Sequence, residues 1–191
     1  EPFSLEESLD RAAEVCKRIN VPLDHCVLEF EVQGAHTKLA PEVWARGVAH
    51  ARERGYGFRH WEISNEPYLM RPGTAFPTPD IYIDHVKAVS TAIRAVDPQA
   101  RIGIGIHKDS QKWGNTILKR TAGYYDFVAA HHYAFVRSIQ TCKFEAAVLA
   151  ANYKALDTCL KVNALMQAYN PDREVVQIDT EWGMHCGGPN G

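Results

Sequence analysis

Several features that mark whole classes of protein are missing from this sequence. No run of about 18 apolar residues occurs, and the first residues form a polar helical pattern rather than a charged stretch followed by an apolar one. Neither a membrane span nor a signal peptide is therefore predicted. Charge of one sign is not in excess, since 21 lysine and arginine residues stand against 23 aspartate and glutamate residues. We expect no nucleic-acid or membrane partner, and a neutral polar substrate fits better than a polyanion.

Cysteine is scarce and scattered. The five cysteines form no CxxC pair and show no zinc-finger spacing, and we predict no cofactor. Their odd number leaves at least one unpaired or bonded outside this chain. Cys16 and Cys159 fall on the apolar faces of predicted helices and are interpreted as small core residues. Cysteine usage therefore leaves the compartment of the protein undetermined.

Apolar residues are plentiful, at 46% of the chain, and their spacing alternates between helical and strand periods. Such alternation predicts a parallel sheet covered by helices, in one domain or a piece of one over residues 1–191. The predicted helices cover about 4–19, 41–54, 78–96, 115–121 and 144–169, and the predicted strands cover 25–32, 57–66, 101–107, 126–133 and 174–182.

Five parallel strands could form an open doubly wound sheet or part of an eight-stranded (β/α)8 TIM barrel. No glycine-rich phosphate turn of the GxGxxG kind follows any strand, which argues against the open sheet. A complete barrel usually needs about 250 residues, and this chain has 191. We therefore predict an incomplete barrel of the α/β class.

Polar and aromatic residues stand where the predicted strands end, which is the edge at which parallel α/β folds carry their reactive groups. Two of them, Glu66 and Glu181, are carboxylates on different strands. Cleavage of a glycosidic bond needs such a pair, one to protonate the leaving oxygen and one to attack the anomeric carbon. The other residues at these ends include Asn65, His107, His131, His132, Tyr133 and Trp182.

Three motifs resemble those of clan A glycoside hydrolases. Residues 61–67 (WEISNEP) resemble the Asn-Glu-Pro signature that ends the fourth barrel strand, and residues 179–183 (DTEWG) resemble the nucleophile strand, the seventh. His131 and Tyr133 match a His-X-Tyr pattern on the sixth. The resemblance covers nearly the whole chain and implies a barrel segment from about the second helix to the seventh strand. Cellulase-like, xylosidase-like and arabinofuranosidase-like families share this skeleton and stay open as alternatives.

The resemblance also implies roles. Glu66 would be the acid and then the base of a retaining glycosidase, and Glu181 would be the nucleophile. Asn65 would bond the sugar 2-hydroxyl, and Tyr133 would donate to the nucleophile. The substrate would be an oligosaccharide or polysaccharide, and this class of enzyme favours a secreted or periplasmic location.

Further contacts follow from the two-residue period of a strand. His131 shares a face with Tyr133, so it is preferred over His132 as a site residue. His107 follows two glycines on an inward face and is another candidate, and Trp182 is a candidate sugar platform. Tyr68 and Phe76, in the loop 67–78, could line a subsite.

Other interpretations stand beside this one. Single glutamates at loop starts are usually solvated surface residues, and histidines, tyrosines and tryptophans are often packed in a core. His107 and His131 are also the type of pair that metal-dependent barrel hydrolases use as zinc ligands. A sugar-binding barrel without catalysis is a third alternative, which would keep the aromatic residues and lose a carboxylate.

Overall fold

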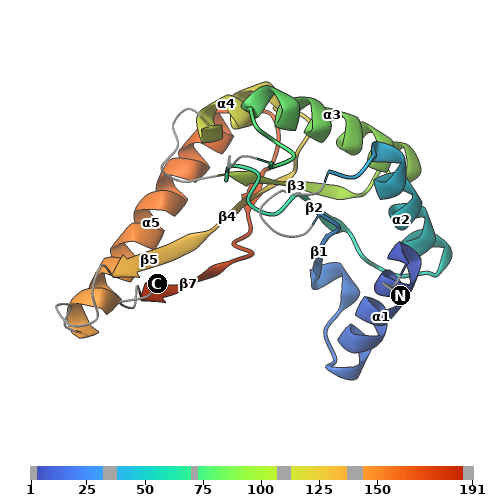
Figure 1. Cartoon of the computed structure of the whole chain (residues 1–191), viewed down its shortest axis with the longest axis horizontal. Coiled ribbons are helices and arrows are strands. Elements are labelled where there is room, and N and C mark those ends of the chain that lie inside the picture. Colours follow the sequence, from blue (N-terminus) through green and yellow to red (C-terminus); the bar gives the residue numbers. More distant parts are fainter. Residues whose placement is uncertain (1–3, 32–37, 70–72, 107–112, 137–143, 187–191) are drawn as a thin grey trace.

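The computed structural model describes residues 4–31, 38–69, 73–106, 113–136 and 144–186. Helices and strands alternate along these segments (Figure 1). In chain order the elements are α1 (Leu5–Arg18), η1 (Leu23–His25), β1 (Val27–Glu29), α2 (Pro41–Glu53), β2 (His60–Ile63), α3 (Pro79–Val96), β3 (Arg101–Ile106), α4 (Trp113–Arg120), β4 (Phe127–Ala130), β5 (His132–Val136), α5 (Phe144–Tyr169), β6 (Val176–Gln177) and β7 (Trp182–Cys186).

Five strands form one parallel sheet in the order β1-β2-β3-β4-β6. The helices form an arch along one side of this sheet (Figure 1). A doubly wound sheet would carry helices on both faces, whereas the wall of a barrel carries them on its outer side alone. The prediction of an incomplete (β/α)8 barrel is therefore confirmed. Among the described residues, no helix is both long and apolar enough to cross a bilayer.

The helix boundaries follow from local chemistry. Ser4 and Glu7 close a capping box at the start of α1, where the Ser4 hydroxyl accepts from the Glu7 N–H at 3.1 Å and the Glu7 carboxylate accepts from the Ser4 N–H at 2.8 Å. Pro41 and Pro79 begin α2 and α3, where their missing N–H costs no intrahelical bond.

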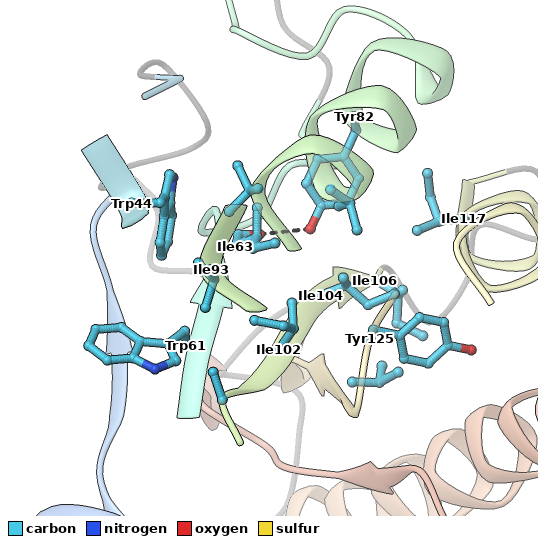
Figure 2. Packing of buried hydrophobic residues seen from close by; sticks show 14 of the residues in the cluster. Trp44, Trp61, Ile63, Tyr82, Ile93, Ile102, Ile104, Ile106, Ile117 and Tyr125 are labelled. Atoms are coloured by element: carbon cyan, nitrogen blue, oxygen red, sulfur yellow. Dashed lines mark hydrogen bonds between the residues drawn. The ribbon is translucent and has the colours of Figure 1, made fainter. Parts of the chain in front are cut away.

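The core lies between the sheet and its helices, with α3 at the centre (Figure 2). Ile102, Ile104 and Ile106 belong to this core. The Tyr82 hydroxyl joins α3 to two strands, because it donates to the Ile63 carbonyl at 2.7 Å and accepts from the Gly105 N–H at 3.1 Å. This hydroxyl fixes the carboxyl end of β2, which leads into the candidate site.

Glycines on the opposite face of β3 let other parts of the chain approach closely. A Cβ on Gly105 would lie 2.8 Å from Cδ of Pro67, the residue that follows Glu66. A Cβ on Gly103 would lie 2.1 Å from the Phe127 ring. The inward glycine face that the sequence predicted is thus filled by neighbouring side chains.

Two predicted strands are wrong in their extent. The stretch 126–133 is divided into β4 and β5 at His131, and the stretch 174–182 contains only the short β6 before β7 begins at Trp182. β5 and β7 pair with each other as a separate two-stranded parallel sheet, with His132 opposite Trp182. The strands break because the side chains of His131, Thr180 and Glu181 are directed into contacts with one another and with β2.

Candidate active site

Glu66 is presented by a tight turn after β2. Ser64 and Glu66 have positive φ angles of 66° and 46°, a left-handed conformation that non-glycine residues rarely adopt. Between them, the Asn65 N–H donates to the Glu31 carbonyl at 3.3 Å. Backbone outliers of this kind cluster at functional sites, where surrounding contacts hold them in place.

Glu66 and Glu181 lie close together across the end of the sheet. One carboxylate oxygen of each, together with a ring nitrogen of His131, all lie within 4.8 Å of one another. Their side chains are 23% and 36% exposed, so both carboxylates can be reached from solvent. Two carboxyl groups about 5 Å apart match the spacing of retaining glycosidases and are too close for inverting ones, which leave about 6.5–9.5 Å for a water molecule.

His131 lies between the two carboxylates. Its Nδ1 is 3.0 Å from Oε1 of Glu66 and 3.5 Å from Oε2 of Glu181, and its side chain is only 4% exposed. Its Nε2 is 3.3 Å from the Thr180 hydroxyl, which in turn is 3.3 Å from Oε1 of Glu62. Nδ1 thus contacts an oxygen of each carboxyl group, and an N–H at this position donates to whichever of them is ionised.

Tyr68 completes the surroundings of Glu66. Its hydroxyl donates to Oε1 of Glu66 at 3.0 Å, the same oxygen that contacts His131. Burial, followed by the Glu66 charge, raises the pKa of Tyr68 far above its usual range, so the phenol stays a donor at any physiological pH. The suggestion that Tyr68 lines the site agrees with this contact. Phe76 is instead fully buried in the core, with its ring 5.0 Å from the ring of Tyr82.

Two carboxyls in the barrel interior have raised pKa values. Burial raises the pKa of Glu62 to about 7, while the Thr180 hydrogen bond and the His131 charge oppose the rise. Burial also raises the pKa of Glu29 to about 8, and the charges of Glu62 and Glu31 add to the effect. A chain of polar groups thus runs from Glu62 through Thr180 and His131 to the carboxylate pair.

The other predicted residues are placed less completely. Asn65 lies in the turn before Glu66, and Trp182, next to Glu181, is 80% exposed. Tyr133 lies in β5 opposite Gly183, and its side chain is outside the described part of the structure. His107 lies outside the described residues, so the two-histidine metal site predicted as an alternative is not tested.

Glu66, His131 and Glu181 bring three ligand atoms within 4.8 Å, close enough to hold a metal ion. Both ring nitrogens of His131, however, already have hydrogen-bond partners in the protein. A proton on Nδ1 and a metal ion at the same atom exclude each other. The arrangement therefore fits proton transfer and nucleophilic attack better than metal ligation.

Sequence reasoning missed Glu31, Glu62 and Thr180. Glu62 carried a signal, because it is an acidic residue inside a strand and is two and four positions before Ser64 and Glu66. Strict alternation of side chains along a strand predicts that Thr180 points away from the face of Glu181. The strand β6 ends at Gln177, however, so this alternation does not extend to Thr180.

Comparisons with solved structures identify the architecture of the chain. No family model and no curated protein matches the chain. Among solved structures, the GH51 alpha-L-arabinofuranosidase from Thermotoga petrophila superposes with a TM-score of 0.71 at 18% identity, over 92% of this chain and 37% of that one. The GH51 arabinofuranosidase from Xanthomonas axonopodis gives 0.70 at 17% identity, over 95% of this chain and 40% of that one.

A GH39 beta-xylosidase from Caulobacter crescentus superposes with a TM-score of 0.62 at 17% identity, over 96% of this chain and 42% of that one. The chain therefore spans well under half the length of these structural neighbours. At such identities the likeness establishes the fold. The described residues have the fold of part of a (β/α)8 barrel, and GH51 arabinofuranosidases and a GH39 xylosidase are among their structural neighbours.

Proposed function

We propose that the protein is a retaining glycoside hydrolase that cleaves O-glycosidic bonds by double displacement, with Glu66 as acid/base and Glu181 as nucleophile. The spacing of the two carboxylates supports this proposal most strongly, since their oxygens lie within 4.8 Å of each other at the carboxyl edge of a parallel sheet. The structural neighbours support it further, because they include an arabinofuranosidase and a xylosidase.

In the first step, protonated Glu66 transfers its proton to the glycosidic oxygen while a carboxylate oxygen of Glu181 attacks the anomeric carbon. The carbon–oxygen bond to the leaving group breaks, and a glycosyl ester of Glu181 forms. In the second step, ionised Glu66 takes a proton from water, the water oxygen attacks the anomeric carbon, and Glu181 is released.

The neighbouring residues keep these two groups in position. His131 and Tyr68 both contact Oε1 of Glu66, and we assign the other oxygen of this carboxyl group to proton exchange with the substrate. His131 also reaches Glu181, at 3.5 Å, and stabilises its charge before attack. We assign Asn65 to the sugar 2-hydroxyl and the exposed Trp182 to a sugar-stacking platform.

Tyr133 and His107 are assigned to the same site by their places in the chain. Tyr133 follows His131 by two residues, and its β5 pairs with the strand that begins after Glu181. We assign it as a donor to the nucleophile, and His107, next after the end of β3, as a further contact to the sugar. Since the neighbours include an arabinofuranosidase and a xylosidase, aryl pentosides are the first substrates to test.

The test compares two variants of the full-length protein on aryl glycosides. We expect Glu181→Ala to lower kcat by roughly 10⁴-fold or more on every substrate, because no nucleophile remains. Glu66→Ala should be slow mainly on substrates with poor leaving groups, because these must be protonated by the acid as they depart. Azide should restore part of the turnover of this variant on activated substrates. The exposed Glu174→Ala is the matched control and should keep wild-type activity. Full activity of Glu181→Ala would contradict the proposal.

A further inference from the structure

Glu31 is a buried carboxylate with an unusually complete set of donors. It follows β1, and no part of it is exposed. Its Oε1 accepts from the Leu39 N–H at 2.8 Å and from the Trp44 indole N–H at 3.1 Å, and it lies 2.8 Å from Nε2 of His85. Its Oε2 accepts from the Ser64 hydroxyl. A carboxylate that is buried away from water is tolerated only when donors such as these satisfy its hydrogen-bonding capacity.

These partners come from separate parts of the fold. Trp44 belongs to α2 and His85 to α3, and both side chains are buried. Three partners on Oε1 therefore fix the position of the carboxylate relative to two helices. Its other oxygen then presents a fixed acceptor to Ser64.

Ser64 begins the turn that carries Glu66. It is fully buried and has a φ of 66°, and Glu66, two residues later, has a φ of 46°. The Asn65 N–H between them donates to the backbone carbonyl of Glu31 at 3.3 Å. Glu31 thus holds the turn through both its side chain and its backbone, and such a turn persists only where its surroundings over-determine it.

We infer that Glu31 is a positioning residue, which holds Ser64 in its left-handed conformation and thereby keeps Glu66 in contact with His131 and facing Glu181. The inference rests on the proposed function for its effect on catalysis. The geometric part of the inference is that the hydrogen bond from the Ser64 hydroxyl to Glu31 positions the Glu66 carboxylate, and this part can be tested without measuring activity.

Ser64→Ala is the sharpest test, because it removes only the hydroxyl that reaches Glu31. A misplacement of about 1 Å can cost about 100-fold in rate, so we expect kcat on poor leaving groups to fall about 10- to 100-fold with KM little changed. Activated aryl glycosides, which do not need the acid, should be affected far less. A residue with a purely structural role would not alter this dependence on the leaving group.

Ser90→Ala is the matched control. Ser90 is also a fully buried serine whose hydroxyl donates one hydrogen bond, to the Tyr124 carbonyl at 2.7 Å, but it lies on α3 away from the site. It should lose similar stability and keep the wild-type dependence on the leaving group. Glu31→Gln is a second variant, which keeps the shape of the side chain. Its kcat on poor leaving groups should fall in the same way as that of Ser64→Ala, but by a smaller factor.

Crystal structures of the Ser64→Ala and Ser90→Ala proteins test the geometry directly. We expect the contact of 3.0 Å between Glu66 and His131 to be lost in Ser64→Ala and kept in Ser90→Ala. An unchanged contact in Ser64→Ala would overturn the inference. The inference would also be overturned if the wild type is active and both Ser64→Ala and Glu31→Gln keep its dependence on the leaving group. That result would leave the proposed function standing. An inactive wild type with a displaced Glu66 in Ser64→Ala would reject the proposed function alone.

Discussion

Replacing Glu62 with glutamine tests the electrostatics beneath the carboxylate pair. Burial raises the pKa of Glu62 from the ordinary value of 4.5 to about 7. Between these values the folded protein keeps a proton that the unfolded chain has released, so the free energy of unfolding falls as the pH rises through this window. A pKa difference of about 2.5 corresponds to about 3 kcal/mol of lost stability once the pH is above both values. Glutamine cannot ionise, so the variant avoids this loss.

The assay is urea unfolding of wild type and Glu62→Gln at pH 5 and pH 8. We expect the free energy of unfolding of the variant minus that of wild type to be about 2–3 kcal/mol higher at pH 8 than at pH 5, because only wild type loses stability over this range. Glu29 keeps part of the pH dependence in both proteins, because its own pKa is raised to about 8. Glu174→Gln, at an exposed position, is the control and should show no such difference between the two pH values.

A variant whose stability follows the same pH curve as wild type would contradict this prediction. Such a result would mean that Glu62 ionises in the folded protein as easily as in the unfolded chain. Water or nearby positive charge would then have to reach a side chain that the structure shows with only 2% of its surface exposed.

Two further predictions concern packing and the sugar site. Gly103→Ala should lower the free energy of unfolding by about 1–3 kcal/mol, because its Cβ would lie 2.1 Å from the Phe127 ring, whereas Gly57→Ala, with no atom within 4 Å of its Cβ, should be close to neutral in the same urea experiment. Trp182→Ala should change stability by less than about 0.5 kcal/mol, since the side chain is 80% exposed. The same substitution should raise KM for oligosaccharides more than for aryl monoglycosides. An unchanged KM for both substrates would contradict the assignment of Trp182 to the sugar site.

The elements that bury a continuous apolar face were predictable from sequence. The helix predicted over 144–169 has the same bounds as α5, and the inward glycine face predicted before His107 lies opposite the isoleucines of β3 that pack in the core. Residues at strand ends were also predictable, because parallel strands bring their carboxyl ends to one edge. Glu66, His131 and Glu181 meet there as that rule requires.

The supporting hydrogen bonds were not predictable in the same way. Thr180 and Glu62 are 118 residues apart in sequence, and Ser64 and Glu31 are 33 apart. No local period relates such pairs, since their contact depends on how strands from different parts of the chain are aligned. The division of the predicted strands 126–133 and 174–182 has the same origin, because side chains bonded across the site interrupt the ladders there.

Trapping of a covalent intermediate tests whether Glu181 is the nucleophile. The full-length protein would be treated with an aryl 2-deoxy-2-fluoro glycoside, whose fluorine slows both steps while its activated leaving group lets the first proceed, so that the glycosyl-enzyme accumulates. Peptide mapping by mass spectrometry would then locate the label. We expect one sugar per protein, attached to Glu181 and absent from Glu181→Ala. A label on another residue, or turnover with inversion at the anomeric carbon, would contradict it.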